Sequence, residues 1–402
     1  MRGRTQIQGG IHMCIDIPAS APGSTRRGFL TGLGVTAAAG ATYLAARPAS
    51  AAASPTMSQG RSRTRIVPLG TAGGPIYQGS GRNGTSTAVV VGERVYIVDL
   101  GLGSLQQLAA SGLAASPTLP SSLAHVSGVF FTHLHSDHTA DWPAMFATSP
   151  SNINGRTGPA IRVYGPGSRG SLPRVYPPSR PEPAVISPED PAPGITAMTG
   201  YLTKAFAQDL NDRIRDNNAP SPGSLFELHD IDISTIWAVD PDGVPPRTDP
   251  FLIWEDGDVK ITATLVDHRP TAPAFAYRFD TPDGSIVVSG DTTVSENLIA
   301  LAEDADYLVH EVIDAAWVDE IAASVPEPIR EALRQHLISS HTTIEQVGKD
   351  VGERAGAKNL VLTHLAPSDN PDGRWMRARR GYSGKVIVAR ELVEIPVSKR
   401  RS

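Results

Sequence analysis

Three histidines and one aspartate occupy four of the six positions from His133 to His138, which read HLHSDH. In an extended chain, residues two apart project to the same side, so His133 and His135 can hold one metal ion together. Asp137 and His138 follow the turn and can face a second ion nearby. Imidazole and carboxylate are ligands that zinc accepts. The spacing predicts a metal site, whereas any one of these histidines alone would indicate a loop or core residue.

Further candidate ligands stand where apolar runs end. Asp291 lies in a Gly-Asp-Thr turn directly after such a run, and His268 and His364 each follow another. A carboxylate at such a turn can bridge two ions at the ~3.5–4 Å spacing that suits two-metal hydrolysis. Alone, the Gly-Asp-Thr sequence indicates only a turn. Together, these positions place polar ligands in loops that rigid strands hold in place.

The elements that must position these residues alternate between β-rich and α/β segments, without a fixed-period repeat. Strands are expected at 66–69, 87–91, 95–98, 126–131, 161–164, 259–266, 274–279, 286–289, 307–310 and 360–362. Helices are expected at 104–110, near 202–215, at 295–305, at 316–337 with interruptions at Pro326 and Pro328, and after His341, where Thr342 and Glu345 fit a capping box and Gly356 a stop. This order predicts an α/β protein with two mixed sheets between helices.

The first 51 residues have the pattern of a twin-arginine signal peptide. Arg26 and Arg27 precede a mildly apolar stretch at 29–44 and an Ala-Ser-Ala cleavage site ending at Ala51. A membrane anchor is the alternative, but the stretch falls short of the ~20 strongly apolar residues that a span needs. We therefore expect no stable anchor, a twin-arginine translocase as partner during export, and a periplasmic, cell-wall-associated or secreted product. Residues 52–64 are expected to form a linker, and Met13 is an alternative start.

Charge and cysteine content restrict the function further. Without the first 51 residues, 31 basic and 40 acidic residues remain, a net charge of about −9. Such a surface has no general attraction for phosphate backbones, so no nucleic-acid partner is expected. The one cysteine, Cys14, lies in the leader, which excludes disulfides and thiolate ligands from the mature chain. Any metal must therefore be held by histidine and carboxylate.

The chain resembles the metallo-β-lactamase superfamily, and within it the branch of ribonuclease Z and arylsulfatase-like hydrolases. The resemblance covers about 65–367 and is weak across 165–250. It rests on motifs that occur in the family's order: Gly70–Pro75, Asp99, the HLHSDH block, Gly290-Asp291-Thr292, Ser340-His341-Thr342-Thr343 and Thr363-His364-Leu365. It implies a four-layer αββα sandwich over 65–396, with an insertion at about 165–250 and a basic tail at 397–402.

The resemblance also implies how the ligands divide between two zinc ions. One ion takes His133, His135 and His268, while Asp291 bridges both ions. The second ion takes Asp137, His138 and His364. Mn²⁺ or iron is an alternative, because the same nitrogen and oxygen ligands suit those metals.

The implied chemistry is attack by hydroxide, formed from water between the two ions, on a phosphorus, sulfur or carbon centre, since bound metal lowers the pKa of water from ~15.7 towards neutrality. Asp137 is expected to orient this nucleophile as well as to bind metal. His341 resembles the family's histidine that protonates the leaving oxygen. Glu311 is expected to orient His341. The alternatives are a helix-terminal role for His341 and a packing role for Glu311.

Ribonuclease Z uses a basic, glycine-rich arm to hold precursor tRNA. In contrast, the insertion at 165–250, named the excursion from here on, is rich in proline, and its acidic residues balance the charge of its arginines. A small anionic ester is therefore the expected substrate, with a phosphodiester preferred. An aryl sulfate, a lactone and a metal-binding protein without activity are the alternatives. Arg269, next to His268, is the candidate anion contact. A homodimer is possible, and residues 316–337 could form a subunit contact or a lid.

Overall fold

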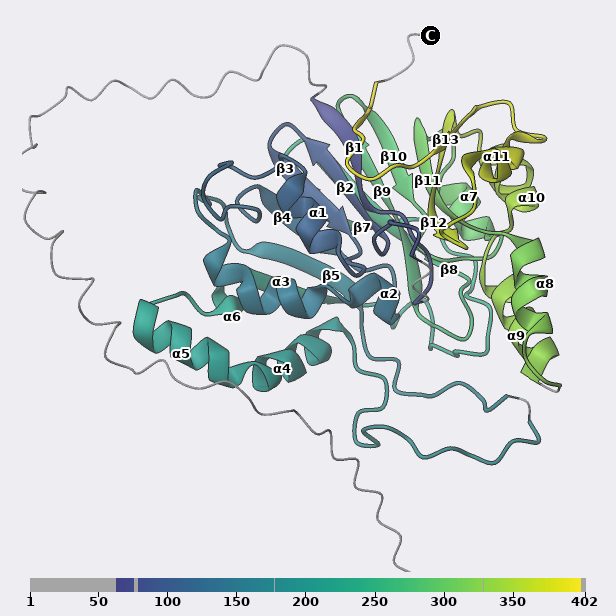
Figure 1. Ribbon diagram of the computed structural model, residues 1–402, viewed down its shortest axis with the longest axis horizontal. Coiled ribbons are helices and arrows are strands. Elements are labelled where there is room, and N and C mark those ends of the chain that lie inside the picture. The colour runs from purple at the N-terminus through teal and green to yellow at the C-terminus, as the bar shows by residue number, and fades with distance from the viewer. Residues whose placement is uncertain (1–62, 76–78, 177, 328, 399–402) are drawn as a thin grey trace, which may run out of the picture. The chain divides into compact units, whose positions relative to one another are not determined.

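Two seven-stranded mixed sheets make up the centre of the computed structural model (Figure 1). It describes residues 63–75, 79–176, 178–327 and 329–398. The expected signal peptide and nearly all of the expected linker and basic tail lie outside these residues. Export, cleavage and the role of Met13 therefore stay predictions from sequence.

The two sheets are built alike. The first contains β1 (Thr64–Gly70), β2 (Ser86–Val91), β3 (Arg94–Val98), β4 (Val126–Phe130), β5 (Ile161–Pro166), β6 (Phe226–Ile231) and β14 (Ile395–Pro396). The second contains β7 (Phe251–Asp256), β8 (Val259–Val266), β9 (Ala274–Thr281), β10 (Gly284–Val288), β11 (Tyr307–Ile313), β12 (Asn359–Ala366) and β13 (Lys385–Val388). The strand orders are β14-β1-β2-β3-β4-β5-β6 and β13-β12-β11-β10-β9-β8-β7. In each sheet, antiparallel strands give way to parallel ones, from β3 to β6 and from β10 to β13.

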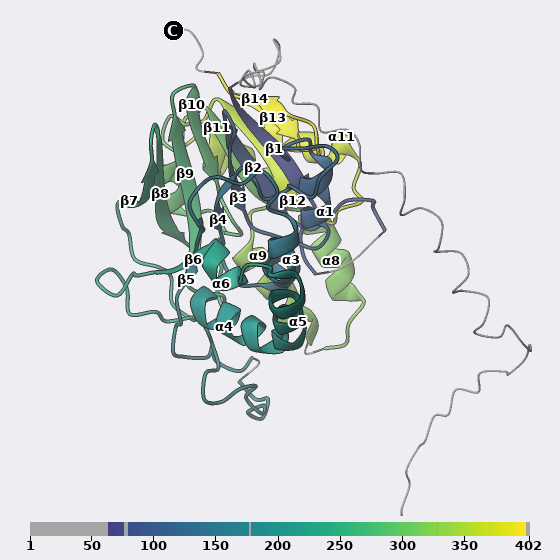
Figure 2. The same ribbon diagram turned by 90° about the vertical axis from the view of Figure 1, so that its left-hand side faces the viewer.

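Helices cover the outer faces of both sheets (Figures 1 and 2). They are α1 (Ser104–Ala110), α2 (Ser136–Thr139), α3 (Trp142–Thr148), α4 (Ile195–Ala205), α5 (Ala207–Asn217), α6 (Pro222–Leu225), α7 (Glu296–Leu301), α8 (Ala315–Ala323), α9 (Ile329–Ser340), α10 (Ile344–Gln346) and α11 (Asp372–Trp375). Short turns of other helix types lie at Ser149–Ser151, Val347–Gly352 and Met376–Arg379. Helix α1 contacts β1, whereas α7 contacts β8 and β9. The four-layer αββα sandwich predicted from the sequence is confirmed.

Three apolar layers hold the sandwich together. The central layer lies between the sheets, where Phe130 meets Phe279 edge to face with ring centroids 5.5 Å apart. A second layer lies between the first sheet and its helices, and a third between the second sheet and its own. Strands buried on both faces need continuous apolar runs, which explains why Thr64–Gly70 and Gly284–Val288 do not alternate.

The excursion at 165–250 departs from the prediction of one helix near 202–215. It holds α4 and α5, which are separated at Phe206, together with α6 and β6. Strand β6 pairs with β5 in parallel from Ile161↔Phe226 to Pro166↔Ile231, so part of the excursion belongs to the first sheet. The sequence of β6, FELHDI, is too polar to predict a strand, because only its two ends are buried.

The capping box was predicted one residue too early. Thr343 and Gln346, rather than Thr342 and Glu345, form the reciprocal bonds at the start of α10. Thr342 is instead buried, and its hydroxyl donates to the carbonyl oxygen of Thr292 at 2.7 Å. The helix also ends at Gly352 in a π-helical turn rather than at Gly356. The local sequence pattern assigned Thr342 to the cap, but its hydroxyl is engaged in a tertiary hydrogen bond instead.

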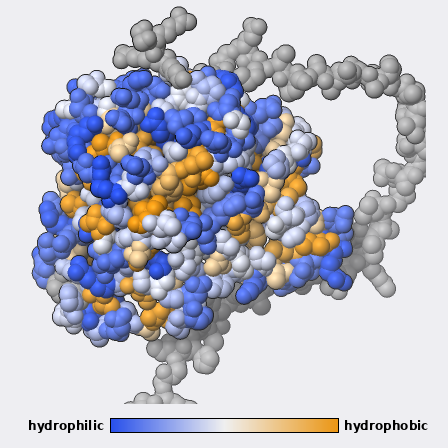
Figure 3. Space-filling model, turned by 180° about the vertical axis from the view of Figure 1, so that it is seen from behind, coloured by the Kyte–Doolittle hydropathy of each residue, from blue (hydrophilic) through white to orange (hydrophobic). Residues whose placement is uncertain are grey.

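Within the part of the chain that the structure describes, no helix is both long and apolar enough to cross a bilayer. On the face shown in Figure 3, hydrophobic residues lie in patches among hydrophilic ones.

Two hydrogen bonds join the sheets immediately before the histidine block. The backbone N–H of Phe275 donates to the carbonyl oxygen of Thr132 at 2.9 Å. The hydroxyl of Tyr277 donates to the carbonyl oxygen of Phe131 at 2.8 Å, and both residues are fully buried. Strand β9 of the second sheet thereby fixes the backbone that leads into His133.

We expect Tyr277→Phe to lower the free energy of unfolding by about 1–2 kcal/mol, because it removes a buried hydrogen bond without changing the ring. Denaturant unfolding followed by circular dichroism measures the loss. The control is Tyr176→Phe, since that hydroxyl donates to Gln335 on the surface at 3.3 Å. Equal stability of the wild type and Tyr277→Phe would show that the bond does not join the sheets.

Candidate metal centre

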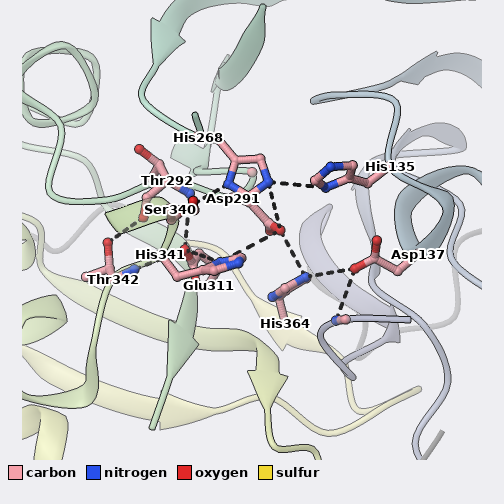
Figure 4. Close-up of polar contacts among 12 residues, drawn as sticks. His135, Asp137, His268, Asp291, Thr292, Glu311, Ser340, His341, Thr342 and His364 are labelled. Carbon is pink, nitrogen blue, oxygen red and sulfur yellow. Dashed lines mark hydrogen bonds and ion pairs between the residues drawn. The ribbon is translucent and has the colours of Figure 1, made fainter. Parts of the chain in front are cut away.

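All seven expected ligands converge at one edge of the sandwich. Figure 4 shows His135, Asp137, His268, Asp291 and His364 among them. They come from the segment after β4, the ends of β8 and β10, and the interior of β12. Together they are His133, His135, Asp137, His138, His268, Asp291 and His364. Their side chains are buried or nearly so. The sequence motifs that lie far apart in the chain therefore form one site.

The first cluster contains His133, His135 and His268, whose ligand atoms all lie within 4.8 Å of one another. The Nδ1 atom of His135 lies 3.0 Å from Nε2 of His133 and 3.3 Å from Nε2 of His268. Three imidazole nitrogens thus point at one place. These three nitrogens cannot all satisfy one another by hydrogen bonds. A cation that accepts a lone pair from each of them is the group that suits this place.

The second cluster contains Asp137, His138, Asp291 and His364. The Nε2 atom of His364 lies 3.3 Å from Oδ2 of Asp137 and 3.2 Å from Oδ2 of Asp291. The same oxygen of Asp291 lies 3.3 Å from Nε2 of His138. It also lies 3.9 Å from Nε2 of both His133 and His268 in the first cluster. Asp291 therefore stands between the two clusters, as a bridging carboxylate must.

The outer nitrogen of several imidazoles has a polar partner, and for His268 and His138 an oxygen that can only accept a hydrogen bond fixes the tautomer. His135 Nε2 lies 2.6 Å from the hydroxyl of Thr271, and His268 Nδ1 donates to the carbonyl oxygen of Ser340 at 2.8 Å. His138 Nδ1 lies 2.8 Å from Oδ2 of Asp99. With the proton on the outer nitrogen, the inner nitrogen keeps a free lone pair, which is the arrangement of metal-binding histidines.

The protonation states of these residues fit divalent ions. Burial lowers the pKa of His133 and His268 well below the usual range, so both imidazoles are neutral. Burial opposes the charged form of Asp291, yet His364 and His138 hold the pKa of its carboxyl well below the ordinary value. The buried Oδ1 of Asp291 and Nε2 of His138 have no hydrogen-bond partner among the described residues. These buried His/Asp clusters are consistent with a dinuclear metal site.

Asp99 organises the segment that carries the second cluster. Its Oδ1 accepts a bond from the backbone N–H of Thr132 at 2.8 Å, and its Oδ2 accepts one from the Thr132 hydroxyl at 2.8 Å besides facing His138. The backbone of Asp99 has φ of 61°, a left-handed conformation in which aspartate is tolerated. The sequence placed Asp99 at a strand end, but its contact with His138 follows only from the fold.

The strand end predicted before His364 is instead a β-bulge. Glu311 pairs with Thr363 and Val312 with Leu365, so His364 is the extra residue. Its φ of 44° turns the side chain out of the sheet and into the site. The strand then continues to Ala366, rather than stopping at Leu362 as expected. The bulge re-aims one ligand without ending the strand.

The glycine turn at Gly70–Pro75 lies against the ligands. A β-carbon on Gly73 would stand 2.5 Å from Nδ1 of His364, which leaves room only for hydrogen. The backbone N–H of Gly74 donates to Oδ2 of Asp137 at 3.0 Å. Glu391 holds this turn by accepting bonds from the backbone N–H groups of Thr71 and Asn83 at 3.2 and 2.7 Å. Sequence reasoning assigned no role to Glu391.

Glu311 and His341 form a pair at the edge of the clusters. Oε1 of Glu311 lies 3.1 Å from Nδ1 of His341, and it also accepts bonds from the backbone N–H groups of Thr292 and Thr342 at 3.1 Å each. Burial alone would lower the pKa of His341, but Glu311, Asp291 and Asp137 together raise it to about 9. The imidazole therefore favours the protonated form, with Nδ1 directed at the carboxylate.

Arg269 lies beside the site but is already paired. Its Nε and Nη2 atoms donate to the two oxygens of Asp267 at 2.8 and 3.0 Å. It lines a cavity of about 510 Å³ together with Arg174, which itself faces Asp242, and His336. Neutralisation by Asp267 weakens the case for Arg269 as an anion contact, which stays a prediction.

The architecture and the clusters agree with what comparison of the sequence finds. A model of the metallo-beta-lactamase superfamily matches residues 79–329. The chain belongs to the metallo-β-lactamase superfamily. It is 30% identical over 350 residues to ribonuclease Z of Mycobacterium bovis (strain BCG / Pasteur), covering 84% of this chain and 99% of the relative. Ribonuclease Z of Mycobacterium marinum is 30% identical over 349 residues, covering 83% and 99%.

Among solved structures of this superfamily, human tRNase Z, short form, matches with a TM-score of 0.51 and 17% identity. The match covers 83% of this chain and 100% of that one. At this identity the likeness shows the shared fold alone. The superfamily, the ribonuclease Z relatives and the buried His/Asp clusters together identify a metal-dependent hydrolase of the ribonuclease Z type.

We expect Gly73→Ala to lower metal affinity, because the added methyl group must push the His364 ring out of the second cluster. Mass spectrometry of the dialysed protein should find the metal content reduced from about two ions towards one per chain. Gly200→Ala on α4 is the matched control, since nothing lies within 4 Å of a β-carbon there. Full metal content in Gly73→Ala would show that His364 is not a ligand in this position.

Proposed function

We propose that this protein is a dinuclear phosphodiesterase that hydrolyses small anionic esters. The observation that carries the proposal is the position of the Glu311–His341 pair, with Nδ1 of His341 3.9 Å from Oδ2 of the bridging Asp291. An imidazole held in the protonated form beside a metal centre is suited to protonate a leaving oxygen. The relationship to ribonuclease Z supports a phosphodiester over a lactone or an aryl sulfate.

The ligand set supports the assignment of His133, His135 and His268 to one ion and of Asp137, His138 and His364 to the other, with Asp291 shared. Zinc, manganese or iron would suit these ligands. Two such ions, when bound, would supply Lewis-acid charge and lower the pKa of water.

Asp137 is placed to orient the attacking water. Its Oδ2 accepts a hydrogen bond from the backbone N–H of Gly74 at 3.0 Å, so its carboxylate cannot rotate freely. His138 and His364 hold the pKa of Asp137 below its ordinary value against the effect of burial. The carboxylate is thus ionised and can accept a hydrogen bond from water.

The leaving group departs towards His341. The water oriented by Asp137 forms a new bond to phosphorus and passes a proton to that carboxylate. At the same time, the bond between phosphorus and the leaving oxygen breaks, and Nε2 of His341 gives its proton to that oxygen. The products are a phosphomonoester and an alcohol, after which Asp137 releases its proton to solvent and His341 regains one. Glu311 keeps the ring oriented and stabilises its charged form through Nδ1, which makes Glu311 a positioning residue.

A second candidate is cleavage of RNA, favoured by the 30% identity to proteins named ribonuclease Z over 99% of their length. We place it second because the chain without its first 51 residues carries a net charge of about −9. RNA binding depends on neutralising phosphates with basic side chains, so it weakens as net negative charge grows. Assays with a precursor tRNA, a small phosphodiester, an aryl sulfate and a lactone, run in parallel, separate these functions.

The first functional prediction concerns the metal ligands. We expect Asp291→Ala and His138→Ala each to reduce hydrolysis of a bis-aryl phosphodiester at least ~10³-fold, because each removes a ligand of the second cluster. Steady-state kinetics and metal analysis on the same samples measure activity and occupancy. The control is His229→Ala, since His229 lies on β6, where it stacks on Tyr164 away from the clusters. Full activity of both ligand variants would disprove the proposal.

Bound metal with no turnover of any ester would instead favour the metal-binding protein without activity. In that case, chelation would lower the melting temperature while all four substrate classes stayed intact. The two outcomes are distinct, because the ligand variants change stability in both cases but change a rate only in one.

The second functional prediction concerns Glu311→Gln. The amide keeps an oxygen that can accept the bonds from Thr292 and Thr342, but it removes the charge that raises the pKa of His341. The acid form of His341 is then lost at lower pH, so the alkaline limb of the rate profile should move to lower pH. The rate with an alkyl leaving group should fall about 10²–10⁴-fold.

The same variant tests the direction of proton transfer. A nitrophenolate leaves without a proton, so Glu311→Gln and His341→Ala should affect an activated nitrophenyl ester far less than an alkyl ester. Equal losses for both leaving groups, with an unmoved alkaline limb, would exclude His341 as the acid. Thermal melting of both variants checks that the fold is intact.

A further inference from the structure

We propose that the excursion at 165–250 builds an apolar pocket beside His135, which binds an aryl or branched alkyl group of the substrate ester. The inference rests on the proposed hydrolase function for its substrate, but the pocket is defined independently. Its volume is about 310 Å³, and His135 of the first cluster forms part of its wall. An ester bound at the metals can therefore reach into it.

The wall of the pocket is mostly hydrocarbon. Apolar side chains come from three separate segments, namely the histidine block, the loop after His268 and the excursion. They are Leu134, Pro166, Ala192, Pro193, Met198, Ala272 and Pro273. None of these is exposed, and the rest of the wall consists of Gly167, His135, Thr271 and Arg169. Apolar walls with few polar groups are typical of sites for organic ligands.

The polar groups of the wall are already used. The hydroxyl of Thr271 lies 2.6 Å from Nε2 of His135, so it serves the metal ligand. Nε of Arg169 donates to the carbonyl oxygen of Ser171 at 2.9 Å. Its Nη1 donates to the carbonyl oxygens of Pro270 and Ala272 at 3.1 and 3.4 Å. Arg169 thus ties the excursion to the loop after His268, and these bonds direct its Nε and Nη1 atoms away from a bound ligand.

The pocket is rigid because helix α4, which carries Met198, is fixed at its first turns. Nε1 of Trp142 donates to the hydroxyl of Thr199 at 3.0 Å, and the N–H of Thr196 donates to Oδ1 of Asp230 at 3.0 Å. Gly194, just before the helix, lies so close to Gly167 that a β-carbon on Gly194 would be 2.7 Å from the α-carbon of Gly167. The two arms of the excursion are therefore packed directly against each other.

Size and polarity together define the group that fits. A dry cavity of about 150 Å³ lined by apolar side chains accommodates benzene, so about 310 Å³ accommodates a one- or two-ring aryl group. A nucleobase would bring several donors and acceptors to a wall whose own polar atoms are engaged, and each unpaired group would weaken binding. The pocket thus favours an aryl or alkyl ester over a nucleoside.

The test compares Met198→Trp with Tyr201→Trp. The first substitution fills the pocket, while the second adds the same ring to the same helix at an exposed position outside the pocket wall. We expect wild-type kcat/KM for a naphthylmethyl methyl phosphodiester, in which both leaving groups are alkoxides, to exceed that for dimethyl phosphodiester at least about tenfold. Met198→Trp should raise KM for the naphthylmethyl ester about tenfold and leave the dimethyl ester within twofold. Tyr201→Trp should change neither.

Binding of 1-naphthol, measured by calorimetry with the metal-loaded protein, separates this inference from the proposed function. If no phosphodiester is hydrolysed but 1-naphthol binds and Met198→Trp abolishes binding, the function is wrong and the pocket stands. If the esters are hydrolysed without preference for naphthyl, and Met198→Trp matches the wild type in rate and in naphthol binding, the pocket inference is overturned.

Discussion

Burial of two carboxylates among imidazoles is the constraint on which the rest of the structure depends. Asp291 is 2% exposed, and Asp137 is 8% exposed. Isolated charges in such places would be costly, because low-dielectric surroundings disfavour an unpaired ion. Burial keeps the imidazoles of His133 and His268 neutral, so they cannot offset that cost. His138 and His364 offset it, because they hold the pKa of both carboxyls below the ordinary value, and Asp291, Asp99 and Asp137 in turn raise the pKa of His138. Divalent cations would take over this positive charge, so metal binding would release a proton from His138.

Holding such a centre requires backbone that ordinary strands do not provide. The bulge at His364, the left-handed Asp99 and the close approach of Gly290 to Thr132 each depart from regular sheet geometry. Asp99 and Gly290 follow the ends of β3 and β10, whereas His364 lies within β12, and all three border the clusters. The inter-sheet bonds from Phe275 and Tyr277 lie immediately beside them. The rigid sandwich thus offsets local strain at its edge, and the strain positions the ligands.

The ligands could be predicted from the sequence because each follows an apolar run, and runs of that kind fix where strands end. The supporting contacts could not. Thr271 serves His135 across 136 positions, and Glu391 holds the glycine turn across 320. No spacing rule connects such residues, since only the packed fold brings them together. The capping box shifted to Thr343 for the same reason, because Thr342 bonds Thr292 across the core. Strand β6 was not predicted, because its own sequence lacks the pattern of a strand and its conformation depends on backbone pairing with β5.

The excursion supplies the part of the site that can contact the remainder of a substrate. A metal centre alone discriminates poorly between esters, because it acts on the phosphorus and its oxygens. Selectivity must come from groups that contact the remainder of the substrate. Here those groups are apolar side chains on α4 and its preceding loop, clamped by Arg169 to the loop that follows His268. Arg169 keeps its charge, but its Nε and Nη1 atoms are directed at backbone carbonyl oxygens of the two loops that it joins. The same contacts that stabilise the pocket thus hold its one basic side chain against the wall, so structural integrity and preference for an organic group have a common origin.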